Sequence, residues 1–104
     1  MREVPLNDLV VLIPKSRDES LTAQRLAKMV DVSEPFIRKK INEARAMGIP
    51  ICSSKRGYYL SDEYGDIAKT IRSLTNRINT QLTAINGLTN RIAKLEKGEK
   101  YEQR

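Results

Sequence analysis

The chain has 104 residues and a formal net charge of +6, with no histidine and one cysteine, Cys52. This length allows one small domain plus an appendage. A single cysteine excludes a disulfide framework within the chain, and the lack of histidine argues against a zinc site built from this chain alone. The longest apolar run, Leu9 to Ile13, is too short for a membrane span or a signal peptide, so we expect no membrane partner and a cytoplasmic location.

The positive charge is concentrated in one region. Between positions 38 and 60 there are six basic residues against one acid, Glu43. A basic balance of this kind favours an acidic partner, with nucleic acid before a membrane surface. The six basic residues are Arg38, Lys39, Lys40, Arg45, Lys55 and Arg56.

The first predicted element is a short helix over residues 6–13, ended by Pro14. Its apolar residues recur at helical spacing. Residues 15–20 predict a polar loop, and the isolated apolar Leu21 predicts a one-residue β-bridge. The apolar residues of this helix are Leu6, Leu9, Val10 and Ile13.

A second helix is predicted to begin after Thr22, whose hydroxyl suits an N-cap. A connection of only three residues, 31–33, leads to a third helix capped by Ser33 and closed by Gly48. Two short helices joined by so few residues predict a helix-turn-helix. The inner face of the second helix would be Ala23, Leu26, Ala27 and Val30.

The third helix has two faces of different chemistry. Ile37, Ile41 and Ala44 follow helical spacing and predict a buried stripe. The opposite face is polar and mostly basic, which suits the major groove of DNA. A solvated basic helix in a hairpin with no DNA role is the plainer alternative. The outer face comprises Glu34, Arg38, Asn42 and Arg45, with Lys39 beside them.

Beyond Gly48 the pattern predicts a β-hairpin. Residues 49–53 alternate in polarity, residues 54–57 form a turn, and an apolar segment follows at 58–60. Gly57 would supply a positive φ near the turn. A hairpin that follows a helix-turn-helix and carries Lys55 and Arg56 at its tip predicts a wing able to contact phosphates.

The segments 21–33, 37–41 and 48–51, together with Gly57 to Leu60, resemble the winged helix-turn-helix of the biotin-operon-repressor family. The resemblance covers residues 5–60, and the ligase domain of that family is absent from this match. It implies double-stranded DNA contacts from the third helix and the wing, and phosphate contacts from the start of the second helix. Carried over by position, the implied DNA-binding residues are Thr22, Ala23, Gln24, Ser33, Glu34, Pro35, Arg38, Lys39, Asn42, Lys55 and Arg56. The outer face of the third helix adds Arg45 as a candidate.

Two residues depart from the family pattern. Asp31 stands in the turn where the family usually has glycine, and aspartate tolerates the left-handed conformation better than most residues. Glu34 puts a negative charge where phosphates are expected, so it would either accept from a cytosine amine or repel DNA and sharpen specificity.

The second half of the chain predicts one long helix over residues 63–97. Isoleucine recurs every seven residues, and three residues later the chain has leucine each time except at Gln81, which is a heptad pattern of a and d positions. The segment 74–78 is repeated unchanged at 88–92, two heptads later, as in a left-handed coiled coil. The predicted oligomerisation residues are Ile67, Ile71, Leu74, Ile78, Gln81, Leu82, Ile85, Leu88, Ile92 and Leu95.

Isoleucine at a and leucine at d favour a parallel homodimer. Leu82 and Ala84 widen the apolar stripe, so a tetramer or an antiparallel pairing stays open. Packing of the helix onto its own domain is a further alternative.

The predicted fold class is therefore mainly α, an α+β winged helix-turn-helix followed by a long coiled-coil helix. The predicted domains are 1–61 for DNA binding, 62–97 for oligomerisation and 98–104 as a disordered tail. No cofactor motif or catalytic constellation is found in the sequence, so we expect no enzyme.

These features predict a homodimer that binds specific double-stranded DNA sequences at the nucleoid, as a phage, plasmid or bacterial transcriptional repressor. Its control would come from its own concentration or from a regulatory protein partner. The alternative is an adaptor in replication, segregation or assembly that uses the winged domain for docking. The basic strip discriminates the two hypotheses, because a docking module would not need it.

Overall fold

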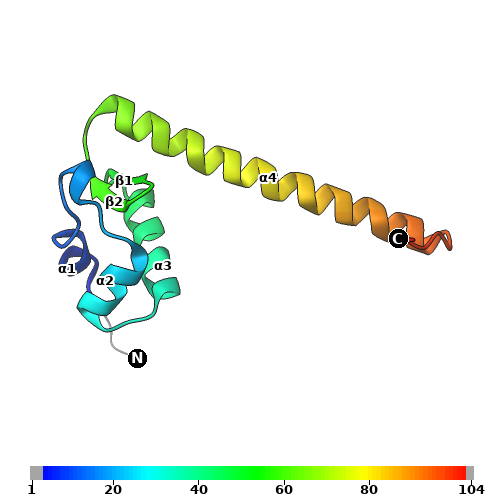
Figure 1. Ribbon diagram of the computed structural model, residues 1–104, viewed down its shortest axis with the longest axis horizontal. Helices are drawn as coiled ribbons and strands as arrows, with labels where there is room; N and C mark the ends of the chain where they lie inside the picture. The colour runs from blue at the N-terminus through cyan, green and yellow to red at the C-terminus, as the bar shows by residue number, and fades with distance from the viewer. Residues whose placement is uncertain (1–3, 103–104) are drawn as a thin grey trace. The chain divides into compact units, whose positions relative to one another are not determined.

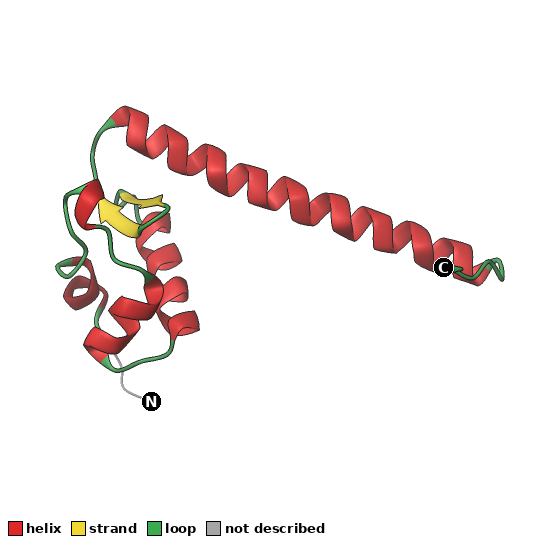
Figure 2. Ribbon diagram, in the orientation of Figure 1, coloured by secondary structure: helices red, strands yellow, loops and turns green. Residues whose placement is uncertain are grey.

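The computed structural model describes residues 4–102, within which helices predominate and one antiparallel hairpin is present (Figures 1 and 2). This is the predicted class, an α+β winged helix-turn-helix followed by a long helix. In chain order the elements are α1 (Leu6–Val10), the 3₁₀ turn η1 (Arg17–Glu19), α2 (Ala23–Val30), α3 (Glu34–Ala46), β1 (Ile51–Ser54), β2 (Gly57–Leu60) and α4 (Tyr64–Glu96).

The described chain divides into two compact units, with the boundary between Thr70 and Ile71. The first turns of α4 therefore belong to the unit that holds the hairpin, whereas the sequence suggested a boundary at residue 61. Residues 1–3 of the predicted first domain and residues 103–104 of the predicted tail lie outside the described part.

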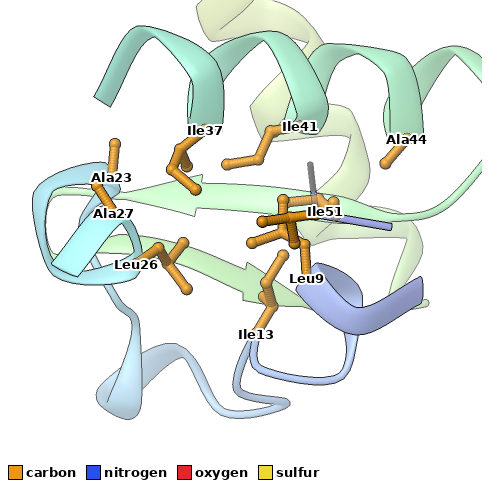
Figure 3. Close-up of a cluster of buried hydrophobic side chains, with 10 residues drawn as sticks. Leu9, Ile13, Ala23, Leu26, Ala27, Ile37, Ile41, Ala44 and Ile51 are labelled. Atoms are coloured by element: carbon orange, nitrogen blue, oxygen red, sulfur yellow. The ribbon is translucent and has the colours of Figure 1, made fainter. Parts of the chain in front are cut away.

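The core of the first unit lies where α3 meets the other elements. Ile37, Ile41 and Ala44 point from α3 toward side chains from α1, α2 and β1 (Figure 3). Ile37 and Leu26 are completely buried, and the small Ala27 lets α2 and α3 approach closely. Apolar burial of this kind is the main favourable term in folding a domain of this size. The buried cluster is Val4, Leu9, Ile13, Ala23, Leu26, Ala27, Ile37, Ile41, Ala44 and Ile51.

The first helix is shorter than the sequence predicts. Regular helix ends at Val10, and the N–H groups of Leu12 and Ile13 then donate to the carbonyls of Leu9 and Val10, three residues back. Proline at position 14 disfavours the α conformation at Ile13, so the last turn tightens and is not continued. Ile13 nonetheless reaches the core, as expected. The segment after it, expected to be an irregular loop, contains the short turn η1.

Three local signals fix the helix-turn-helix as predicted. The Thr22 hydroxyl accepts a hydrogen bond from the Arg25 N–H, and the Ser33 hydroxyl accepts one from the Phe36 N–H. Asp31 closes α2 in the left-handed conformation, with φ 56° and ψ 55°. The aspartate therefore takes the backbone geometry that glycine would otherwise provide.

The hairpin pairs residues 51–54 with 57–60, and Leu21 joins it through the predicted bridge. The Leu21 N–H donates to the Tyr58 carbonyl at 3.0 Å, and the Tyr58 N–H donates to the Leu21 carbonyl at 2.7 Å. Gly57 lies beside this bridge with φ 126°. A Cβ at position 57 would lie 2.3 Å from the carbonyl carbon of Leu21, so the close approach requires glycine.

The start of α4 is attached to the hairpin by polar contacts. The Ser61 hydroxyl donates to the Asp66 carboxylate at 2.7 Å, and the Ser53 N–H donates to the buried Thr70 hydroxyl. Burial, followed by the nearby Asp66 carboxylate, raises the pKa of Tyr59 above its ordinary value. Tyr59 therefore stays neutral throughout the physiological range and acts as a packing residue.

Gly57→Ala should lower the free energy of unfolding by at least about 2 kcal/mol. The added methyl group would collide with the Leu21 backbone and disrupt the Leu21–Tyr58 bridge, and the alanine would have to adopt a disfavoured φ. Urea unfolding followed by circular dichroism measures this. Gly65→Ala is the matched control, because nothing lies within 4 Å of its added methyl group. It should leave stability unchanged or raise it by up to about 1 kcal/mol. Equal stability of both variants would refute the close approach.

Candidate nucleic-acid interface

The outer face of α3 presents the polar side chains expected there. Arg38, Lys39 and Asn42 are exposed, while Ile37 and Ile41 of the same helix are buried. The apolar face of α3 therefore packs in the core, and the polar face is open to solvent. Ser33 and Pro35, at the start of α3, are also exposed. An open helical face with amide and guanidinium groups can donate to base edges in a major groove.

Glu34 has a third role besides the two predicted from the sequence. Its carboxylate accepts from the Arg38 guanidinium at 3.4 Å, one helical turn away, with both side chains about half exposed. Such an exposed pair contributes only about 0.3–0.5 kcal/mol to stability. The pair places the Glu34 carboxylate beside the Arg38 guanidinium on the outer face of α3.

The start of α2 contributes only part of what was expected. Thr22 and Gln24 are exposed, but the side chain of Ala23 is 6% exposed and belongs to the core. A phosphate contact from Ala23 would therefore come from its backbone N–H and not from its buried methyl group. The backbone N–H groups of a helix start remain suited to a phosphate.

Lys55 and Arg56 form the two-residue tip of the hairpin, and both are exposed. The Arg56 guanidinium donates to the carbonyl of Asp18 at 3.3 Å. An open hollow of about 620 Å³ lies between the tip and α2. Its lining includes Arg25, Lys28 and Arg56.

Arg25 and Lys28 were missed in the sequence analysis. Both are exposed on α2 and share the lining of the hollow with Arg56 of the wing. Their spacing of three residues on the polar side of α2 was the available signal. What the sequence did not show is that the wing folds back next to that side of the helix.

Arg45 is a correction to the predicted outer face. Its side chain is half-buried, and its Nε donates to the Ile51 carbonyl at 2.8 Å. Its guanidinium also lies 5.6 Å from the centroid of the Tyr58 ring. The hairpin covers the last turn of α3, so Arg45 joins α3 to the wing and does not project with Arg38. We therefore leave Arg45 out of the interface.

The predicted oligomerisation residues fall into two groups. Ile67 is half-buried within the first unit, so it is not part of an open stripe. Leu74 is also half-buried, and Gln81 is exposed. The remaining seven apolar side chains of the stripe are each at least half exposed, namely Ile71, Ile78, Leu82, Ile85, Leu88, Ile92 and Leu95.

The segment predicted to be a disordered tail begins with an ordered helix end. Gly98 has φ 84°, and the Glu99 N–H donates to the Lys94 carbonyl. The Tyr101 ring lies 5.3 Å from the Arg91 guanidinium. The described part of this segment, up to residue 102, thus returns to the helix.

Within residues 4–102 no cluster of three or more histidine, cysteine, aspartate or glutamate side chains is placed to hold a metal ion. Across the same residues no helix combines the length and the apolar character needed to cross a membrane. Cys52 is buried.

Comparison with known protein families identifies the family of the first unit. The family model described as "HTH domain" matches residues 5–59, which is more than half of the chain, and the chain belongs to this family of helix-turn-helix DNA-binding domains. The partner of the domain is accordingly DNA. The resemblance to the biotin-operon-repressor type is finer than this match and stays a prediction. No curated protein and no solved structure matches the chain.

Arg45→Ala should lower the free energy of unfolding by about 1–2 kcal/mol, because it removes a half-buried hydrogen bond and its packing on Tyr58. Lys39→Ala, an exposed cation on the same helix, should change stability by no more than about 0.5 kcal/mol. Thermal unfolding of both variants measures the difference. Equal stability of Arg45→Ala and wild type would contradict the structural role.

Proposed function

We propose that the chain is a homodimeric, sequence-specific double-stranded DNA-binding protein that acts as a transcriptional repressor. The observation that carries the proposal is the open outer face of α3, with Arg38, Lys39 and Asn42 exposed above a buried apolar face. In this proposal α3 enters the major groove and its N-terminal half contacts base edges.

Arg38 and Asn42 are the residues we assign to base contacts. A guanidinium suits the O6 and N7 of guanine, and an amide suits the N6 and N7 of adenine. The Glu34 carboxylate holds the Arg38 guanidinium in the free protein. It therefore preorganises Arg38 and reduces the rotamer entropy lost on binding.

The phosphate contacts are assigned to the wing and α2. One open hollow is lined by Arg25 and Lys28 of α2 and by Arg56 of the tip. Lys55 lines a neighbouring hollow together with Arg56. Cations at the edge of a recognition helix neutralise phosphates and release counterions, which gives affinity without sequence preference. Thr22 and Gln24, which are exposed at the start of α2, are also assigned to contacts with DNA phosphates.

The exposed stripe of α4 supports the homodimer. Six large apolar side chains at a and d positions, with Leu82 beside them, are at least half exposed in the single chain, and burying them against a second copy is favourable. A dimer with two-fold symmetry would bind two half-sites about 34 Å apart or at a multiple of that distance. Occupation of such a doubled site would repress transcription by blocking access to the DNA.

The test compares Arg38→Ala with Lys55→Ala in mobility-shift titrations over a range of salt concentrations. Arg38→Ala should weaken binding to a selected site by about 1–3 kcal/mol and relax the preference at one base pair. Lys55→Ala should weaken binding to all sequences alike and lower the salt slope by about 1.

Lys94→Ala provides the control, because it removes the same charge from α4, outside the proposed interface. It should bind the selected site as wild type does. If both interface variants bound the selected DNA site with wild-type affinity, the proposal would be contradicted. If wild type gave no shift even at low salt, the adaptor function would be favoured instead.

A further inference from the structure

We infer that α4 joins a second copy of the chain in a parallel, in-register coiled coil whose orientation is set by the polar layer at Gln81. This inference rests on the homodimer of the proposed function and adds its geometry. It fixes which residues face each other and on which end the two DNA-binding units are attached.

The stripe on the second unit contains eight consecutive layers. The a positions are Ile71, Ile78, Ile85 and Ile92, and the d positions are Leu74, Gln81, Leu88 and Leu95. Seven of these side chains are apolar, and Gln81 alone is polar. A polar residue in an otherwise apolar seam specifies register in coiled coils at some cost in stability, because its polar group needs a partner in the seam.

Gln81 discriminates between the two orientations. In a parallel coil in register, the two Gln81 amides face each other and can exchange hydrogen bonds. In the antiparallel coil that keeps all layers paired, each Gln81 faces Ile85 of the other copy. Each amide then loses its partner, and a buried amide without a partner is destabilising.

The charged residues beside the seam favour the same orientation. In the parallel coil Arg91 at g lies next to Glu96 of the other copy at e, and this pair occurs twice. In the antiparallel coil Arg91 lies next to Arg77 of the other copy, which puts like charges together. Residues 78–90 carry no charge, so the middle of the seam contributes no ion pair in either orientation.

The contact between Arg91 and Tyr101 is compatible with this pair. The Tyr101 ring lies 5.3 Å from the guanidinium carbon of Arg91. A guanidinium can contact an aromatic face while its N–H groups bind a carboxylate. The returning tail would hold Arg91 at the edge of the seam, near Glu96 of the other copy.

A shifted parallel register is also disfavoured. The repeated segments 74–78 and 88–92 are identical, so a shift by two heptads would align them. Such a shift leaves Gln81 opposite Leu95 and reduces the overlap to half of the layers. The Gln81 layer therefore opposes the slip that the repeated sequence would otherwise allow.

The test uses disulfide formation at positions 71 and 95. The full-length variants Ile71→Cys and Leu95→Cys are mixed, refolded together and oxidised mildly, and linked peptides are identified by mass after digestion. In the parallel coil, links join two copies of position 95, or two copies of position 71. In the antiparallel coil, links join position 71 to position 95.

We expect like-position links to exceed 71–95 links by at least about tenfold, because mispairing leaves two buried amides without partners. Wild type controls for Cys52, which is buried and should give no link. Predominance of 71–95 links would overturn the inference. Helicity by circular dichroism shows that the variants are folded.

The variant Gln81→Leu tests the cause of the preference. It should raise the thermal stability of the dimer and at the same time reduce the excess of like-position links. An unchanged excess would show that Gln81 does not set the orientation. Both experiments are accompanied by sedimentation analysis. A monomer would contradict this inference and the proposed homodimer, whereas a dimer with 71–95 links would contradict only the parallel arrangement.

Discussion

The bridge between Leu21 and Tyr58 is the interaction on which the first unit depends. Its two backbone hydrogen bonds attach the hairpin to the residue that precedes α2. Gly57 makes this possible, because a side chain there would collide with the Leu21 backbone. The bridge places the wing tip near the exposed side of α2, so cations from two distant parts of the sequence surround one hollow.

The helix-turn-helix was predictable because its signals are local. Thr22 and Ser33 cap their helices through their own hydroxyl groups, and Asp31 adopts the left-handed conformation within the turn. The buried stripe of α3 follows from helical spacing alone. The end of α1 was placed too late, because the tightened turn before Pro14 depends on a conformational preference that apolar spacing does not reveal.

The candidate interface was less predictable, because it depends on contacts between elements. A helical projection puts Arg45 on the same face as Arg38. The hairpin covers this end of α3, however, and the Arg45 guanidinium donates a hydrogen bond to the Ile51 carbonyl of β1. Arg25 and Lys28 were passed over because only the folded wing brings Arg56 near them. The Glu34–Arg38 pair has the i, i+4 spacing of a helix, so it was visible in the sequence as a possible ion pair.

The two units divide the proposed task. The first unit presents the polar face of α3, and the second carries an apolar stripe that a single chain leaves exposed. If the units work together, the preferred DNA site is doubled, because each copy brings one α3. The most direct measurement is selection of bound sequences from a random double-stranded DNA pool by the full chain. We predict an inverted repeat with half-site centres about 34 Å apart, or a multiple of that distance. A pool with no enriched motif would contradict sequence-specific binding, and a single unpaired half-site would contradict the dimer.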